Sequence, residues 1–500
     1  MEIPYMIVQA GGKGTRMKKL TRNKPKALVP VQNLPMIFHL FRKFPDKKYI
    51  IIGDYKYEVL QRYLEAFADI DYQMVNAKGN QGTLGGLKEA LSYLPQGQAF
   101  MLIWSDLILS EDFQLPDEPG NYVGISKGFT CRWKYENGHF SEQPSEEYGV
   151  AGQFIFQDKS MLEEIPKEGE FVRWLGESGI PFHELALVHT KEYGLLSEYE
   201  KLKPEMCRSF NRLTVQGNLV IKEGIDAQGK ALAVRERRWY EKLAEKEFSS
   251  IPKIYALNPL TMEKVDGKNI YEYTDISFAE KKEILGCIIR CLKQIHALES
   301  APANRDSYLE AYIGKTYKRL EKIRSLVPFA SDEAVMINGR RCRNVFFVRE
   351  LLEEKIMQYM PQTFQLLHGD CTFSNTLLKH NKTPVLIDPR GYFGSTELYG
   401  DPAYDWVKLY YSIVGNYDQF NRKRFELDIR PDEVLLQIES NHWEEMEQTF
   451  FDLLHGEADP EQMHLLHAVI WMSLTTYAWE DYDSICGAFY NGLYYLEEAL

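Results

Sequence analysis

The sequence contains no apolar run close to the ~20 residues that a membrane-spanning helix needs. Its N-terminus enters an apolar segment, residues 5–8, without the basic region and long apolar core of a signal peptide. The sequence also has fewer basic than acidic residues. The resulting formal net charge of −13 opposes binding to nucleic acid or to an anionic membrane surface. We therefore expect a cytoplasmic protein with small-molecule partners, no nucleic acid and no membrane insertion. Its oligomeric state stays open.

Cysteines are few and irregularly placed. The seven, an odd number, follow no disulfide-framework spacing and stand at positions 131, 207, 287, 291, 342, 371 and 486. Cys287 and Cys291 fit one face of a helix better than a metal knuckle. No internal repeat is evident either, which argues against a solenoid. These absences favour a reducing compartment and argue against a structural zinc.

The pattern of apolar and polar residues along the sequence changes near residue 204. Before it, short β-branched or apolar runs alternate with helical patterns, which predicts an α/β, doubly wound domain with a parallel sheet over residues 1–203. The expected strands are 6–9, 49–52, 72–75 and 100–104, and the expected helices are 35–44, 57–67 and 85–94. Residues 204–500 are predicted to form a small sheet lobe and a larger helical lobe. The expected elements there are a hairpin at 213–224 and helices at 234–246, 279–298, 307–326 and within 432–500.

A glycine-rich loop, Gln-Ala-Gly-Gly-Lys-Gly-Thr-Arg-Met at residues 9–17, follows the first expected strand. Its glycines let backbone N–H groups approach phosphate oxygens closely, and they are Gly11, Gly12 and Gly14. Arg16 and Lys26 add positive charge where phosphates would lie. Ligands of such sheets bind beyond the carboxyl ends of the strands, where Asp106 also falls. The sequence thus predicts a phosphate-binding site at this edge.

A second segment, Leu-His-Gly-Asp-Cys-Thr-Phe-Ser-Asn at residues 367–375, places Asp370 and Asn375 in one short loop. An apolar run then delivers Asp388. Phosphoryl-transfer sites combine such groups, since one carboxylate orients the acceptor hydroxyl and the others bind Mg²⁺. Lys222, at the end of the hairpin far upstream, completes the set of residues that a kinase site requires.

The N-terminal motifs, Gly-Gly-x-Gly-Thr-Arg-Met at 11–17 and Lys-Pro-Lys-x-Leu-x-Pro-Val at 24–31, resemble those of sugar-phosphate and phosphocholine-type nucleotidyltransferases. The resemblance implies a Rossmann-like, GT-A-type domain in which a phosphomonoester attacks the α-phosphorus of an NTP and pyrophosphate leaves. It implies catalytic roles for Arg16 and Lys26 and a Mg²⁺ ligand at Asp106. The nucleotide-binding residues it implies are Gly11, Gly12, Gly14, Thr15, Gln81, Gly82 and Thr83.

The second metal carboxylate departs from that family's pattern. Relatives carry an Asp before a Gly late in the domain, whereas this chain offers Glu192 in Lys-Glu-Tyr-Gly. We expect Glu192 to be the second Mg²⁺ ligand, and the alternative is an exposed Glu at the start of a helix.

The C-terminal motifs resemble the aminoglycoside phosphotransferase and choline kinase superfamily, which has a two-lobed, protein-kinase-like α+β fold, over about residues 208–500. The resemblance implies that Asp370 acts on the acceptor hydroxyl, that Asn375 and Asp388 bind Mg²⁺, and that Lys222 contacts the α- and β-phosphates of ATP.

Three further acidic residues receive roles from the same resemblance. Glu236 is the expected ion-pair partner of Lys222, with Glu241 as the alternative. Glu263 opens the segment 263–267, which is expected to meet the adenine.

Together the two resemblances imply a bifunctional enzyme. A small hydroxylated metabolite would be phosphorylated with ATP and then coupled to a second NTP, which is CTP, UTP or GTP. The metabolite is a sugar, a polyol or an amino alcohol, and the product would be an NDP-activated precursor for surface polysaccharide or headgroup synthesis. Mg²⁺ or Mn²⁺ is the expected metal. The alternatives are a nucleotidyltransferase with a regulatory or degenerate kinase-like module, and an antibiotic-modifying kinase.

Overall fold

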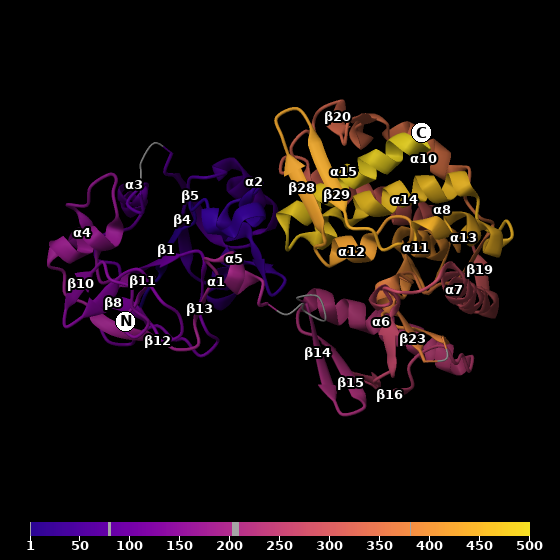
Figure 1. Cartoon of the computed structure of the whole chain (residues 1–500), viewed down its shortest axis with the longest axis horizontal. Helices are drawn as coiled ribbons and strands as arrows, with labels where there is room; N and C mark the ends of the chain where they lie inside the picture. The colour runs from indigo at the N-terminus through magenta and orange to yellow at the C-terminus, as the bar shows by residue number, and fades with distance from the viewer. Residues whose placement is uncertain (1, 79–81, 203–209, 381) are drawn as a thin grey trace. The chain divides into compact units, whose positions relative to one another are not determined.

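The computed structural model describes residues 2–78, 82–202, 210–380 and 382–500. The chain divides into two compact units, the first made of Met1–Lys203 and Glu480–Tyr482 and the second of Pro204–Trp479 and Asp483–Leu500. Each unit has its own sheets and helices (Figure 1).

The first unit is built on a seven-stranded sheet in the order β12-β8-β11-β6-β1-β4-β5. The strands are β1 (Tyr5–Gln9), β4 (Lys48–Gly53), β5 (Asp71–Asn76), β6 (Phe100–Trp104), β8 (Tyr122–Ser126), β11 (Val150–Phe156) and β12 (His183–Leu187). β1 is parallel to both β4 and β6, and β4 is parallel to β5. The four strands predicted from the sequence are therefore parallel as expected, whereas β11, which the sequence analysis did not predict, is antiparallel to both β6 and β8. The connection from β8 to β11 holds only a small hairpin, and a strand without a crossover helix before it returns antiparallel.

Helices and short strands complete this unit. The helices are α1 (Met36–Lys43), α2 (Tyr57–Phe67), α3 (Leu87–Ser92), α4 (Phe171–Ser178) and α5 (Leu196–Tyr199). One apolar cluster joins the sheet to α3 and α4, since Ile7, Leu102 and Phe154 are fully buried with Leu87 and Val172. The short strands are β2 (Pro30–Val31), β3 (Leu34–Pro35), β7 (Leu107–Ile108), β9 (Lys134–Glu136), β10 (His139–Ser141) and β13 (Lys191–Glu192). Pairing of β7 with β13 sets Glu192 opposite Leu107, directly after Asp106.

The second unit begins with a four-stranded sheet in the order β14-β15-β17-β16. Its strands are β14 (Asn211–Gln216), β15 (Leu219–Gly224), β16 (Ile254–Leu257) and β17 (Leu260–Glu263). The predicted hairpin is confirmed, because β14 and β15 pair antiparallel around a turn at Gly217. Helix α6 (Ala227–Glu245) begins at Asp226, whose side chain accepts a hydrogen bond from Gly229 N at 2.7 Å. In Figure 1 these strands lie at one end of the unit, and the helices α11, α14 and α15 lie at the other.

The remainder of the second unit is mainly helical. Its helices are α7 (Phe278–Leu298), α8 (Arg305–Leu309), α9 (Lys315–Ile323), α10 (Arg349–Met357), α11 (Ala403–Ile413), α12 (Tyr417–Asn421), α13 (Glu447–Leu454), α14 (Pro460–Leu474) and α15 (Tyr482–Ala499). The single helix predicted at 307–326 is divided, because a π-helical turn over Glu310–Gly314 separates α8 from α9.

Short strands also cross this helical part. They are β18 (Gly267–Asn269), β19 (Ser300–Pro302), β20 (Ala334–Ile337), β21 (Arg340–Arg343), β22 (Thr363–Leu366), β23 (Thr376–Lys379), β24 (Pro384–Leu386), β25 (Tyr392–Phe393), β26 (Thr396–Glu397), β27 (Tyr399–Gly400), β28 (Phe425–Ile429) and β29 (Val434–Ile438). The wholly helical tail predicted from residue 432 is wrong at β29, where Val434 and Leu436 are buried in alternation with more exposed residues. The predicted classes, an α/β unit followed by a two-lobed α+β unit, are confirmed.

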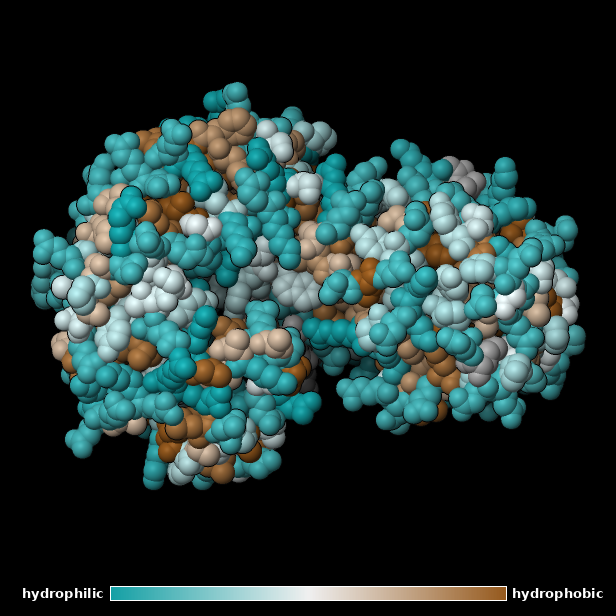
Figure 2. All heavy atoms as spheres, turned by 180° about the vertical axis from the view of Figure 1, so that it is seen from behind, coloured by the Kyte–Doolittle hydropathy of each residue, from teal (hydrophilic) through white to brown (hydrophobic). Residues whose placement is uncertain are grey.

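Hydrophilic side chains predominate on the face shown in Figure 2, and apolar residues are interspersed among them. Over the described part of the chain, every helix is too short or too polar to cross a lipid bilayer.

Candidate active sites

The glycine-rich loop of the first unit follows β1 and leads into a 3₁₀ helix over Thr15–Thr21. Gly14 has a φ of +62°, in the left-handed region that favours glycine. Within the described residues, the backbone N–H groups of Gly11, Gly12 and Gly14 donate to no protein acceptor. Thr15 is exposed at the start of the 3₁₀ helix. The loop therefore presents backbone donors that an anion can accept.

The four charged residues predicted for this site converge beside that loop. Asp106 follows β6 with 8% exposure, and its carboxylate accepts a hydrogen bond from Lys26 Nζ. A Cβ atom added at Gly194 would lie 3.2 Å from Lys26 Nζ and 3.3 Å from Arg16 Nη2, and it would overlap Glu192. Burial and then the neighbouring Asp106 raise the pKa of Glu192, against the lowering effect of Lys26 and Arg16. Two carboxylates and two cations thus share one small volume.

Glu192 lies in β13 and is partly buried, so the alternative of an exposed Glu at a helix start is wrong. Two adjacent carboxylates are hard oxygen donors of the kind that Mg²⁺ prefers. The residues present therefore fit a divalent cation.

The segment predicted to contact the base is only partly described, because Gln81 lies outside the described residues. Gly82 has a φ of +80°. The Thr83 hydroxyl accepts a hydrogen bond from Phe171 N at 2.7 Å, and the Thr83 carbonyl accepts one from Gln9 Nε2 at 2.7 Å. Thr83 is thereby fixed between β1 and the start of α4.

In the second unit, Lys222 of β15 lies between two carboxylates. Its Nζ is 2.9 Å from Glu236 Oε2 and 2.8 Å from Asp388 Oδ1. Burial lowers the pKa of Lys222, but Asp388 and Glu236 outweigh this and hold the pKa above its ordinary value. Of the two partners that the sequence left open, the structure pairs Glu236 with Lys222, while Glu241 is exposed on the same helix.

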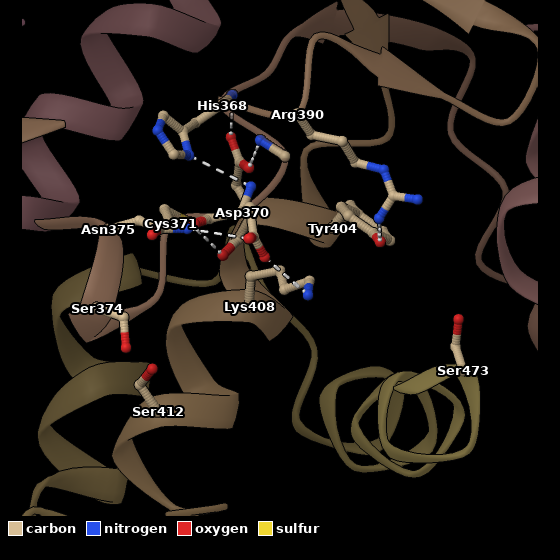
Figure 3. A network of polar contacts seen from close by, with 12 residues as sticks. His368, Asp370, Cys371, Ser374, Asn375, Arg390, Tyr404, Lys408, Ser412 and Ser473 are labelled. Atoms are coloured by element: carbon tan, nitrogen blue, oxygen red, sulfur yellow. Dashed lines mark hydrogen bonds and ion pairs between the residues drawn. The ribbon is translucent and has the colours of Figure 1, made fainter. Parts of the chain in front are cut away.

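Asp370 lies in the loop after β22, between Asn375 and Lys408 (Figure 3). Its Oδ1 is 2.9 Å from Lys408 Nζ, and its Oδ2 accepts a hydrogen bond from Asn375 Nδ2 at 2.9 Å. Burial raises the pKa of Asp370, but Lys408 and then Arg390 hold the pKa below its ordinary value. Asp370 is therefore ionised at neutral pH and can accept a hydrogen bond from a hydroxyl group.

A buried carboxylate fixes this loop from behind. Asp405 of α11 accepts hydrogen bonds from His368 N at 3.0 Å and Gly369 N at 2.6 Å, and its Oδ2 lies 2.9 Å from His296 Nε2. Gly369 has a φ of +79°, so the loop bends in a conformation that favours glycine. The backbone before Asp370 is thus held at two consecutive N–H groups.

Asn375 and Asp388 are neighbours, because Ile387 N donates to the Asn375 carbonyl at 3.0 Å. Their side-chain oxygens fit a hard cation. Among the described residues, no group of three or more His, Cys, Asp or Glu side chains could hold a metal ion. Each site instead offers a pair of side chains, which suits Mg²⁺ because water and substrate phosphates normally complete its coordination.

Glu263 stands at the end of β17, where its Oε2 accepts a hydrogen bond from Lys253 N at 3.2 Å. The carboxylate thus binds the backbone of the neighbouring strand. The hinge position predicted for residues 263–267 falls in the link between β17 and β18.

Lys408 and Tyr404 are functional candidates that the sequence analysis missed. They lie four residues apart on α11 and so share one face of the helix. Arg390 Nη1 donates to Tyr404 Oη at 2.6 Å, and Arg390 Nη2 donates to Tyr392 Oη at 2.9 Å. The sequence shows that Tyr404 and Lys408 are four residues apart, but it does not show that this helix face packs against the loop that contains Asp370.

Comparisons with known proteins match both units. Residues 208–448 match the model of the phosphotransferase enzyme family, and residues 5–116 match the nucleotidyl transferase model. D-glycero-alpha-D-manno-heptose 1-phosphate guanylyltransferase of Campylobacter jejuni is 33% identical over 100 residues, which are 19% of this chain and 45% of that protein. UTP–glucose-1-phosphate uridylyltransferase of Haloferax volcanii is 29% identical over 108 residues, which are 21% of this chain and 44% of that protein.

Among solved structures, the CTP:phosphocholine cytidylyltransferase of Streptococcus pneumoniae is 20% identical, with a TM-score of 0.34 over 40% of this chain and 98% of that chain. The matches span less than half of the length of both curated relatives. Both family resemblances predicted from the sequence are confirmed.

Proposed function

We propose that this chain, a fusion of a nucleotidyltransferase domain with a phosphotransferase-family domain, catalyses two consecutive reactions. The second unit transfers the γ-phosphoryl group of ATP to a hydroxyl group of a small metabolite. The first unit couples the resulting phosphomonoester to an NTP and releases pyrophosphate. The observation that carries the proposal is that both sets of charged residues, around Asp370 and around Asp106, are assembled in one polypeptide.

In the phosphorylation step, the ionised Asp370 orients the acceptor hydroxyl and accepts its proton as the phosphorus–oxygen bond forms. Lys222, positioned by Glu236, binds the α- and β-phosphates of ATP. Asn375 and Asp388 would hold Mg²⁺, and the ion would neutralise negative charge on the phosphates of ATP. Because Asp405 and Lys408 fix Asp370 before substrate arrives, little reorganisation is needed.

In the nucleotidyl transfer step, the N–H groups of the glycine-rich loop bind the triphosphate, and Arg16 and Lys26 stabilise the negative charge on the α-phosphate. Asp106 and Glu192 would hold Mg²⁺ or Mn²⁺, which would neutralise negative charge on the triphosphate. Gly82 and Thr83 would contact the base, and the hydrogen bonds of Thr83 to Phe171 N and Gln9 Nε2 fix the backbone of this turn for that contact.

The activities of the two curated relatives, a guanylyltransferase and a uridylyltransferase for sugar 1-phosphates, support an NDP-sugar type of product. We propose in addition that this product is made in the cytoplasm and serves surface polysaccharide synthesis. The retained Lys222, Asp370 and Asp388 argue against a degenerate kinase module. An antibiotic-modifying kinase would need no nucleotidyltransferase domain.

The test is incubation of the full chain with Mg²⁺, mixed NTPs and a panel of sugars, polyols and amino alcohols, followed by mass spectrometry. We expect a new phosphomonoester and, after it, an NDP adduct of the same compound. Formation of a phosphomonoester with no NDP adduct under any NTP would refute the coupled sequence.

A further inference from the structure

Four cations gather beside Asp370 on the side of the helical lobe. They are Lys315 and Arg319 of α9, Arg390 of the loop after β24, and Lys408 of α11. The Tyr404 ring lies close to two of them, since its centroid is 5.5 Å from Lys315 Nζ and 5.5 Å from Arg390 Cζ. Arg235 of α6 adds a fifth positive charge, with Cζ 4.2 Å above the Tyr392 ring that Arg390 also contacts.

These cations are poorly neutralised by the protein. Lys408 is paired with Asp370, but among the described residues Lys315, Arg319 and Arg390 form no ion pair with a carboxylate. Arg319 donates instead to the carbonyl and hydroxyl oxygens of Ser473. In Figure 3, Arg390 and Tyr404 lie beside Lys408, and the Ser473 side chain turns toward the same side.

Positive charges this close together repel one another unless a negatively charged group neutralises them. Lys315 and Arg319 are four residues apart on α9, a spacing at which like charges destabilise a helix. Burial, and then Arg390, Arg319 and Lys408, lower the pKa of Lys315 well below its ordinary value, and the smaller raising effect of Glu310 does not offset them. A ligand with negative charge would relieve this repulsion, whereas a quaternary ammonium or polyamine ligand would increase it.

We propose that the kinase acceptor carries an anionic group, a phosphate or a carboxylate, which Lys315, Arg319 and Arg390 bind while its hydroxyl group meets Asp370. The proposal rests on the proposed function and narrows its substrate class. Arginine and lysine together suit this role, because guanidinium groups bind phosphate or carboxylate in bidentate fashion. ATP is assigned to the group around Lys222, which pairs with Glu236 and Asp388. Choline-like and aminoglycoside-like acceptors are disfavoured.

The first test compares neutral and anionic acceptors that share a carbon skeleton. Glycerol, glycerol 3-phosphate and glycerate form one matched set, and glucose, glucose 6-phosphate and glucuronate form another, with choline as a cation. We expect phosphorylation of an anionic acceptor with kcat/KM at least about 10-fold above its neutral counterpart. Comparison of the phosphate esters with the carboxylates shows which of the two anionic groups the acceptor carries. Preference for neutral or cationic acceptors would overturn the inference and leave the proposed function standing.

The second test uses Lys315→Met and Arg319→Gln, with Lys318→Met as a matched control, since Lys318 is exposed on the same helix. We expect Lys315→Met and Arg319→Gln each to raise the KM about 10- to 100-fold for an anionic acceptor and much less for a neutral one, whereas Lys318→Met should keep the wild-type KM for both acceptors and for ATP. Equal losses on anionic and neutral acceptors would show that the cluster acts on the transferred phosphoryl group and would overturn the inference.

A third measurement does not depend on the identity of the acceptor. Inorganic sulfate is titrated calorimetrically into the full chain saturated with a non-hydrolysable ATP analogue. We expect a saturable site in the wild type and in Lys318→Met that Lys315→Met loses. Identical binding in all three proteins would refute the anion site. Sulfate binding at this site without phosphorylation of any compound in either panel would refute the proposed function alone.

Discussion

Asp370→Asn tests the kinase site most directly, because it changes the charge of Asp370 and leaves its shape nearly unchanged. The carboxylate accepts one hydrogen bond from Lys408 and one from Asn375, each at 2.9 Å. An asparagine has only one acceptor oxygen, so its amide nitrogen must face one of these two donors. The variant loses a charge-assisted hydrogen bond worth about 1.5–3 kcal/mol and the group that accepts the hydroxyl proton.

The expected effect on kcat is a loss on the order of 10²-fold or more, since a positioned general base contributes about 10²- to 10⁴-fold. A 10²-fold loss corresponds to about 2.7 kcal/mol of transition-state stabilisation, which agrees with the cost of the lost hydrogen bond. Nucleotidyl transfer should be unchanged, because Arg16, Lys26, Asp106 and Glu192 lie in the other unit.

Two assays separate these outcomes. Phosphorylation of the acceptor identified by the adduct panel is followed by mass spectrometry, and nucleotidyl transfer from supplied phosphomonoester is followed by pyrophosphate release. Asp306→Asn, the same chemical change at an exposed position of α8, is the control. A loss of less than 10-fold, or equal losses of both activities, would refute the assignment of Asp370.

Three other changes have defined outcomes. Arg16→Ala should stop pyrophosphate release and let the phosphomonoester accumulate in the mass spectra, and no accumulation would show that the order of steps is wrong. Asp405→Asn should lower the free energy of unfolding by about 1–3 kcal/mol for each N–H group of His368 and Gly369 that loses its acceptor; an unchanged denaturation midpoint would contradict this. Burial lowers the pKa of His467 from 6.5 to about 3, so the unfolded state binds the proton first and stability falls as the pH drops below 6.5. Between pH 6.5 and 5.5 the wild type should lose about 1 kcal/mol more than His467→Gln in chemical denaturation, and parallel pH profiles would contradict the assignment.

Local sequence patterns predicted the parts of the fold that depend on local chemistry. Runs of buried β-branched and aromatic residues placed β1, β4 and β6 within one residue of their observed bounds. The glycine spacing at 11–14 and the Asp370 to Asn375 interval each describe a single loop, so their residues are neighbours whatever the rest of the chain does.

Other features depend on which elements pack together, and sequence periodicity does not supply that. The direction of β11 follows from its connection, and β29 is a strand because it pairs with β28. Lys408 meets Asp370 only because Asp405, one turn earlier on α11, binds the loop from behind. Arg319 joins the same region through Ser473 of α14, far away in sequence. No single-sequence pattern links these residues.

The positive charges of Lys315, Arg319, Arg390 and Lys408 imply that α9 is less stable than it could be, and that this loss of stability serves the binding of an anionic acceptor. Lys315 is partly buried, lacks a carboxylate partner among the described residues, and repels Arg319 on the same helix face. Lys315→Met should therefore stabilise the folded protein by about 0.2–0.5 kcal/mol or more in buffers without multivalent anions, because the side chain keeps its length and loses the repulsion. Adding sulfate should raise the unfolding temperature of the wild type more than that of the variant, since a ligand that binds only the folded state stabilises it by mass action. A variant less stable than the wild type without sulfate would show that Lys315 is held by favourable contacts, and the argument that repulsion is relieved by an anionic acceptor would then lose its physical basis.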